Sequence, residues 1–425
     1  MQSRNNVLLA LGLASALSFA LVGCPGPGAT PDQQSQGNSE AVKAFDHKKT
    51  VSVPVGPHGM AFAGGRIVNA SPNGFKIAVI DPDQESVVKE LDFSGETPQG
   101  KPSYTKASHD AAYAFNLDGG AKALRVIKGA TGEQVKKIAL DGATPGSKCV
   151  WEDDTTLIVP LKDAASKQNI ARIKWTGGFE ADPTVDRLTV NSDTATDSVG
   201  GFAAVGAGFI AAPNAADNSV SFIKIGNPEV TTIKQGLGPS AIDISTYGGK
   251  ATLLFGNKIS NTVVLYDLNE KKVVTELSVG KEPTDMALRA DGRYAYVTCK
   301  GSEEVAIIDL GEKKATMVKV GRKLLDAAST ANAGPVHIYA VTAPAAASQY
   351  RTAHEGHDHD ADKQQIWVGG DGDGSVTVLD AETQKVIGVV RVGNGHHKMA
   401  FTATKAFVSN ITDNTVSIID RALVK

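Results

Sequence analysis

Short apolar runs that end in a polar or charged residue recur along the whole chain. Eight copies are present: IAVID (77–81), ALRVIK (123–128), IARIK (170–174), VSFIK (220–224), VVLYD (263–267), VAIID (305–309), VTVLD (376–380) and VSIID (416–420). The ends of successive copies lie 40–50 residues apart, except for one interval of 71 residues that carries an insertion. In each unit, Gly- and Asp-rich turns separate short apolar segments, which predicts about four β-strands per unit.

The clearest unit contains ADGRYAYVT (290–298), and the last unit contains FVSN (407–410) followed by DNTV (413–416). These segments resemble the YVTN-type β-propeller repeat, and the resemblance covers about residues 50–425. It implies an all-β propeller in which each unit forms one four-stranded blade. Because this architecture hosts many unrelated activities, the resemblance leaves the function open.

The number of blades follows from the number of units. We predict eight blades, or seven if the degenerate third or fourth unit does not form one. The last unit has only three segments of strand character, whereas TVSVPV (50–55) is an apolar segment without a unit of its own. We therefore expect residues 50–55 to close the ring by completing the final blade, which would protect an exposed strand edge.

Composition excludes several classes of protein. The net charge of −3 argues against a nucleic-acid partner, and three cysteines in 425 residues argue against a disulfide scaffold. The sequence has no nucleophile elbow, phosphate-binding loop, dinucleotide fingerprint or HExxH motif. These absences do not exclude an enzyme, because propeller sites are assembled from loops far apart in the sequence. We nevertheless expect one monomeric propeller that is not an enzyme, and we rank an enzyme or redox unit last.

The N-terminus has the pattern of an export signal. Arg4 gives a positive start, and residues 7–22 form an apolar stretch too short for a comfortable membrane span. The stretch ends in LVGC (21–24), which resembles the lipobox of bacterial lipoproteins. This resemblance implies that residues 1–23 are removed and that Cys24 carries the lipids that anchor the protein.

The rest of the chain divides into a tether and a folded domain. Residues 24–48 begin with a stretch rich in Pro, Gly, Gln and Ser, which is typical of a flexible linker. Residues 49–425 are predicted to form the propeller. The protein is thus expected in the cell envelope, anchored by lipid to a bacterial membrane and facing the periplasm or the exterior.

Histidines recur where the first strands of two units begin. GPHGMAF (56–62) aligns with GHHKMAF (395–401), so His58 and His397 occupy one position in two blades that the ring makes neighbours, with His396 beside them. His337 joins them if the seventh blade starts with the strand around 339–341. A competing register starts that strand near Leu325 and moves His337 outward.

Converging imidazoles at the mouth of a central channel suit Zn²⁺, with Cu²⁺ as the alternative. The other interpretation is that these histidines cap the inner strands by hydrogen bonding to neighbouring turns. A second histidine cluster lies in the insertion at about residues 343–364, where His354, His357 and His359 alternate with acidic residues. Such a tract is typical of labile metal capture, although a solvated acidic loop is the alternative.

The placement of these histidines is similar to that in propeller-type zinc metallochaperones that serve zinc ABC transporters. The resemblance implies that His354, His357 and His359 capture zinc. It also implies that His58 and His397, with His337 or His396, hold the ion more tightly, and that the partner is a metal-transport binding protein. We therefore predict an exported, membrane-anchored propeller that captures or delivers a transition metal. The alternative is a non-catalytic surface scaffold that binds a protein or a glycan.

Overall fold

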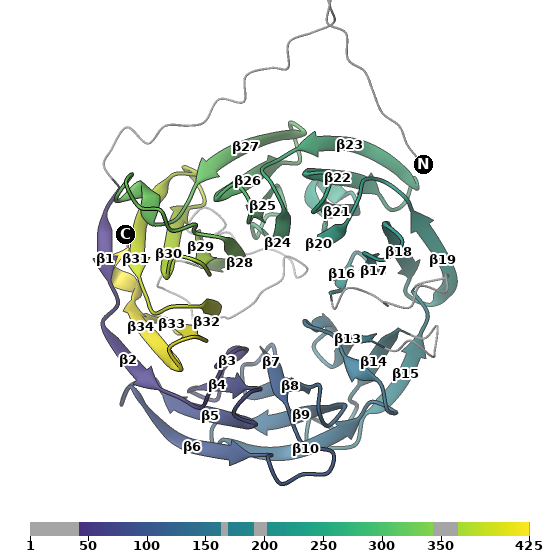
Figure 1. The fold of residues 1–425 in the computed structure, drawn as a ribbon. Helices are drawn as coiled ribbons and strands as arrows, with labels where there is room; N and C mark the ends of the chain where they lie inside the picture. The colour runs from purple at the N-terminus through teal and green to yellow at the C-terminus, as the bar shows by residue number, and fades with distance from the viewer. Residues whose placement is uncertain (1–41, 163–168, 191–201, 343–363, 425) are drawn as a thin grey trace, which may run out of the picture. The chain divides into compact units, whose positions relative to one another are not determined.

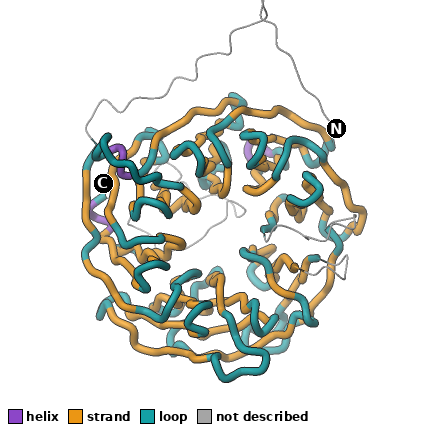
Figure 2. Tube along the Cα trace, viewed as in Figure 1, coloured by secondary structure: helices purple, strands orange, loops and turns teal. Residues whose placement is uncertain are grey.

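The structure, a computed structural model, describes residues 42–162, 169–190, 202–342 and 364–424. These residues belong to one compact unit, which is described here by itself. They form eight β-sheets arranged as blades around a common centre (Figure 1). Figure 2 shows that nearly all of the described chain is strand or loop. In this part of the chain no helix has the length and apolar character needed to cross a membrane.

Within each blade, strands that follow one another in the chain are antiparallel and run outward in chain order, so that the first strand of the unit lies nearest the centre. The N-terminal strands β1 and β2, described below, are added at the outer edges of the last two blades. The first four blades contain β3 (Met60–Ala63), β4 (Arg66–Ser71), β5 (Lys76–Asp81) and β6 (Ser86–Asp92); β7 (Pro102–Ala107), β8 (Tyr113–Asp118), β9 (Ala123–Lys128) and β10 (Glu133–Ala139); β11 (Thr144–Pro145), β12 (Val150–Asp153), β13 (Thr156–Lys162), β14 (Ile170–Lys174) and β15 (Thr184–Leu188); and β16 (Ala204–Gly206), β17 (Phe209–Asn214), β18 (Ser219–Lys224) and β19 (Asn227–Ile233).

The remaining four blades have the same plan. They contain β20 (Pro239–Ser245), β21 (Thr252–Asn257), β22 (Thr262–Asp267) and β23 (Lys272–Ser278); β24 (Pro283–Leu288), β25 (Tyr294–Cys299), β26 (Glu304–Asp309) and β27 (Lys314–Lys319); β28 (Pro335–Thr342), β29 (Gln364–Gly370), β30 (Ser375–Asp380) and β31 (Val386–Arg391); and β32 (His396–Phe401), β33 (Lys405–Asn410) and β34 (Thr415–Asp420). Three short 3₁₀ turns are described as well: η1 (Tyr247–Gly249), η2 (Arg322–Leu324) and η4 (Arg421–Leu423).

The ring closes where the sequence predicted. Strand β2 (Lys49–Ser52) pairs antiparallel with β34 and supplies the fourth strand of the last blade. Val51 lies opposite Val416 and is buried with apolar residues of both the first and the last blade, among them Met60. Closure by the N-terminal segment and the count of eight blades are therefore confirmed, and the alternative of seven blades is excluded.

An additional strand, β1 (Ala44–Asp46), was not foreseen. It pairs in parallel with β31 and adds a fifth strand to the outer edge of the seventh blade. The Phe45 ring lies against Gly388, where an added Cβ would meet Phe45 Cε2 at 2.6 Å. Strand pairing thus begins earlier in the chain than the apolar pattern indicates.

The third blade has a broken inner edge. Both β11 and β12 pair with β13, one after the other along the same side. The residues between them leave the ladder, and Lys148 and Cys149 lie in this break. The interruption explains why the third unit looked degenerate in the sequence.

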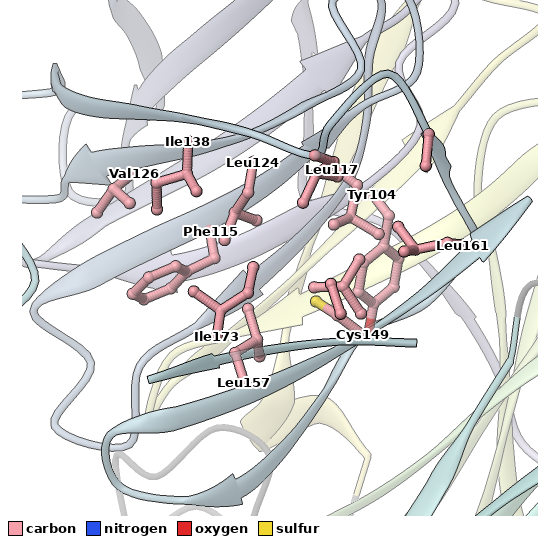
Figure 3. Packing of buried hydrophobic residues seen from close by; sticks show 14 of the residues in the cluster. Tyr104, Phe115, Leu117, Leu124, Val126, Ile138, Cys149, Leu157, Leu161 and Ile173 are labelled. Atoms are coloured by element: carbon pink, nitrogen blue, oxygen red, sulfur yellow. The ribbon is translucent and has the colours of Figure 1, made fainter. Parts of the chain in front are cut away.

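Apolar clusters between neighbouring blades hold the ring together. Figure 3 shows the cluster between the second and third blades, in which Phe115 and Leu124 face Leu157 and Ile173. Cys149 lies in this cluster and Cys299 in a later one, and both thiols are free. Because burial of apolar surface has no preferred direction, repeated flat faces of this kind can stack around a closed ring.

Candidate functional site

His58 and His397 lie side by side at the junction between the first and the last blade. Their ring centroids are 3.8 Å apart, although the residues are far apart in the sequence. The backbone of His58 is held from both sides, because its N–H donates to Ala70 O and its carbonyl accepts from Ser409 Oγ of the last blade. The closure of the ring therefore creates this pair of imidazoles, as their aligned positions predicted.

His337 lies on β28, which is the inner strand of the seventh blade. The register that starts this strand near Leu325 is therefore wrong, and the chain just before Leu325 forms η2 instead. A bulge follows Pro335, and His337 comes one position later along its strand than His397 does. Even so, the rings of His337 and His397 have centroids only 4.5 Å apart.

His396 points in another direction from His397, as expected for successive residues of a strand. Its ring lies against Gly369 of β29, where an added Cβ would meet His396 Cε1 at 1.8 Å. Only a residue without a side chain leaves room for the imidazole there. Because Gly369 pairs with His337, the His396 ring reaches the same neighbourhood from the adjacent eighth blade.

The buried imidazoles are neutral at physiological pH. Burial, reinforced by the charge of Lys398, lowers the pKa of His58 to about 4 and that of His337 to about 3. Burial and the neighbouring His337 lower the pKa of His396 to about 3, and the same two causes place the pKa of His397 lower still. Neutral imidazole is the form that can ligate a metal ion.

Several nitrogens of these rings are buried and have no hydrogen-bond partner among the residues that the structure describes. They are Nδ1 of His58, Nδ1 of His397, Nε2 of His337 and both ring nitrogens of His396. Leaving a buried polar atom without a partner costs about 1–3 kcal/mol. The interpretation that these histidines only cap strands does not account for these five atoms, since a capping nitrogen is by definition hydrogen bonded.

Charged residues that the sequence analysis did not single out surround the imidazoles. Lys398 Nζ lies 3.0 Å from His337 Nδ1, and Asp285 Oδ2 of β24 lies 3.4 Å from the same nitrogen. Lys148 Nζ lies 3.5 Å from the other oxygen of Asp285. Burial raises the pKa of Asp285, but Lys148 and His337 outweigh it and hold that pKa below its usual range.

In the residues that the structure describes, no three His, Cys, Asp or Glu side chains already converge on a point that could hold a metal ion. The four imidazoles form a cluster whose nitrogens face different directions. His354, His357 and His359 lie outside the described residues, and so does Cys24. The predictions made for these four residues therefore stay predictions.

Comparison with known proteins places the fold. No protein-family model matches the chain, and no curated protein matches it significantly. Among solved structures it is similar to "Dihydro-heme d1 dehydrogenase NirN in complex with DHE", with a TM-score of 0.55 and 15% identity over 84% of this chain and 69% of that one. The chain is a β-propeller.

Two further structures support the same conclusion. Hydrazine synthase of Kuenenia stuttgartiensis has a TM-score of 0.52 and 16% identity, over 92% of this chain and 100% of that chain. Virginiamycin B lyase from Staphylococcus aureus has a TM-score of 0.51 and 16% identity, over 76% of this chain and 96% of that chain. At such low identity these likenesses establish the architecture alone.

At Gly59 the backbone of the first blade lies very close to that of the second blade, and this contact leads to a testable prediction. A Cβ at Gly59 would lie 2.3 Å from Ser103 O and 2.6 Å from Thr105 N, and both of these are backbone atoms that cannot turn aside. Gly59→Ala should therefore lower the free energy of unfolding by about 1–3 kcal/mol, as overpacking does, and should displace the adjacent His58. Urea unfolding measures the loss. Gly95→Ala is the control, since a Cβ there meets nothing within 4 Å, and an equal loss in both variants would contradict the prediction.

Proposed function

We propose that the protein is an exported zinc-binding propeller that captures a transition metal at the cell envelope and hands it on. One observation carries the proposal. Imidazoles from the first, seventh and eighth blades meet, and several of their buried nitrogens have no hydrogen-bond partner in the described part of the chain. Zinc is here a cargo, and no reaction is assigned to the site.

The chemistry of the donors fits zinc. Neutral imidazole nitrogen is a common ligand of Zn²⁺, and the rings of His58 and His337 both lie beside that of His397. Their unpartnered nitrogens are the atoms with lone pairs to offer once each ring adopts the right tautomer.

Asp285 supports the same assignment. Ligating histidines commonly donate their second ring N–H to a carboxylate, which fixes the tautomer and aims the other nitrogen at the metal. Asp285 Oδ2 lies 3.4 Å from His337 Nδ1, so this carboxylate is placed to hold His337 with Nε2 as the ligand. Nε2 is also the His337 nitrogen that has no partner.

The remaining parts of the proposal rest on the sequence. His354, His357 and His359 would collect metal and pass it to the central cluster by ligand exchange, and lipid on Cys24 would keep the propeller at the membrane. The receiving partner would be a metal-transport binding protein. Copper remains the alternative cargo, and competition between the two ions decides between them.

Calorimetric zinc titration tests the central site. The reference is a variant in which His354, His357 and His359 are all alanine, so that only the central cluster is measured. Adding His58→Ala and His397→Ala to this reference should abolish the tight site, because two of its three imidazoles are gone. Adding His47→Ala and His109→Ala instead is the matched control, since these rings lie outside the cluster and bond to Thr50 and to Asp154.

The opposite outcome has a clear meaning. If the reference protein binds zinc as tightly after the loss of His58 and His397 as before, the central cluster is not a metal site. The surface scaffold for a protein or glycan would then be the better account of the propeller.

A further inference from the structure

We propose that Lys398 is a tethered cation that blocks the histidine cluster until a metal ion displaces it. This inference deepens the proposed function, on which it rests, by assigning a competitor built into the site.

Lys398 is positioned by the strand that carries His397. Its backbone N–H donates to Ser409 Oγ, and the residue is only 8% exposed. The side chain runs inward until Nζ lies 3.0 Å from His337 Nδ1 and 5.6 Å from the centroid of the Tyr104 ring. The ammonium group of Lys398 therefore lies among the imidazoles, while the backbone of the residue is part of strand β32.

The hydrogen bond fixes which nitrogen of His337 can act. An ammonium group has only donors, so Lys398 must donate and His337 Nδ1 must accept. A neutral imidazole that accepts at Nδ1 carries its proton on Nε2. In this arrangement the lone pair of Nδ1 is used by the lysine and Nε2 holds a proton, so neither nitrogen can bind a metal.

Asp285 is a second possible hydrogen-bond partner for His337 Nδ1. Asp285 Oδ2 lies 3.4 Å from His337 Nδ1 and is held there by Lys148, which lies 3.5 Å from the other oxygen. When Lys398 leaves, Nδ1–H can donate to Asp285 and the lone pair of Nε2 becomes free. Lys398 and Asp285 thus select opposite tautomers of one imidazole.

Charge makes the exclusion mutual. An ammonium group and a divalent ion repel strongly at short range in a site shielded from water, so both cannot occupy the cluster together. The lysine consequently weakens metal binding, and it also supplies a replacement cation when the metal departs. A cargo site gains from this, since after release the ammonium group again donates to His337 Nδ1.

The test is zinc affinity in the reference protein that lacks the three histidines of the insertion. Lys398→Met removes the charge and the donor while keeping most of the volume, and should tighten zinc binding at the central site by about tenfold or more. Lys398→Arg keeps the charge and should leave the affinity near that of the reference. Lys258→Met, at an exposed turn, controls for the loss of a positive charge elsewhere on the propeller.

The outcomes separate this inference from the proposed function. If zinc binding depends on His58 and His397 but Lys398→Met leaves the affinity unchanged, the blocking role is wrong and the metal site stands. If the Lys398→Met protein shows no zinc site that His58 and His397 control, both proposals are wrong. Binding that appears only after Lys398→Met would support the blocking role most strongly.

A second measurement does not depend on metal. Nitrogen chemical shifts of the His337 ring distinguish the two neutral tautomers. Metal-free reference protein should carry the proton on Nε2, and the Lys398→Met protein should carry it on Nδ1, toward Asp285. Lys398→Leu, which also lacks a donor, serves as a second variant should the methionine protein fold poorly, and an unchanged tautomer in a folded variant contradicts the proposal.

Discussion

Replacing Val51 with aspartate should lower the free energy of unfolding by about 3 kcal/mol or more. Val51 is buried in the apolar cluster that joins the last blade to the first. The substitution gives up about 1.5–3 kcal/mol of apolar burial and places a carboxylate in a site with no cation to receive it. Because β2 supplies the fourth strand of the eighth blade, the loss weakens the closure of the ring.

Urea unfolding measures this loss, and Val55→Asp is the matched control. Val55 lies three residues beyond the end of β2 and is 56% exposed, so aspartate there stays in water. The His58–His397 pair spans the same junction, and Val51→Asp should therefore weaken zinc binding as well. Equal stability of the two aspartate variants would show that β2 does not close the ring.

The free energy of unfolding should fall steeply as the pH drops from about 6.5 to about 4. The unfolded chain protonates its histidines near pH 6.5, whereas burial lowers the pKa of His58 to about 4 and those of His337 and His396 to about 3. In this window the unfolded state therefore binds more protons than the folded state. Each of these histidines lowers the free energy of unfolding by up to about 1.4 kcal/mol for every unit by which the pH falls. Above pH 6.5 these groups are neutral in both states, and their contribution is constant.

Urea midpoints measured across this range test the prediction. The His396→Gln side chain cannot titrate. This substitution should therefore reduce the slope of the free energy of unfolding against pH by up to the contribution of one histidine. His47→Gln is the control, because its ring lies at the edge of β2, outside the buried cluster. A slope that the His396 substitution does not change would mean that this imidazole is protonated in the folded protein. Carboxyl groups also take up protons toward the lower end of this window. Because the His396 and His47 variants share the same carboxyl groups, the difference between their slopes isolates the contribution of the imidazole.

The sequence predicted the ring of blades and the closing strand β2, but it did not predict strand β1. Residues 50–55 had strand character and no blade, and a final unit short of one strand supplied the place for them. Strand β1 gave no such signal, because three residues are too few to show an alternation. It is held by the fit of Phe45 onto Gly388, a contact that only the folded structure brings together.

The sequence predicted those residues of the site that occupy the same position in two repeat units, and it did not predict the others. His58 and His397 stood out because two units align around them. Lys398 and Asp285 did not, since a charged residue in a short strand is usually solvated and neither forms part of a repeated motif. The signal available in the sequence was their position. Asp285 and Lys398 are each the third residue of the inner strand of their blade, as His337 is in the seventh blade.

Closure by β2 also sets the order in which the protein can be completed. Gly56, just beyond β2, donates to Asn414, 358 residues away, so the first part of the propeller to be synthesised waits for the last. Contacts so distant along the chain form slowly, because a long loop must be closed before they stabilise anything. The eighth blade and the His58–His397 pair can therefore be assembled only when synthesis is nearly finished. A protein that stops short would contain most of its blades, yet it would lack the imidazole pair.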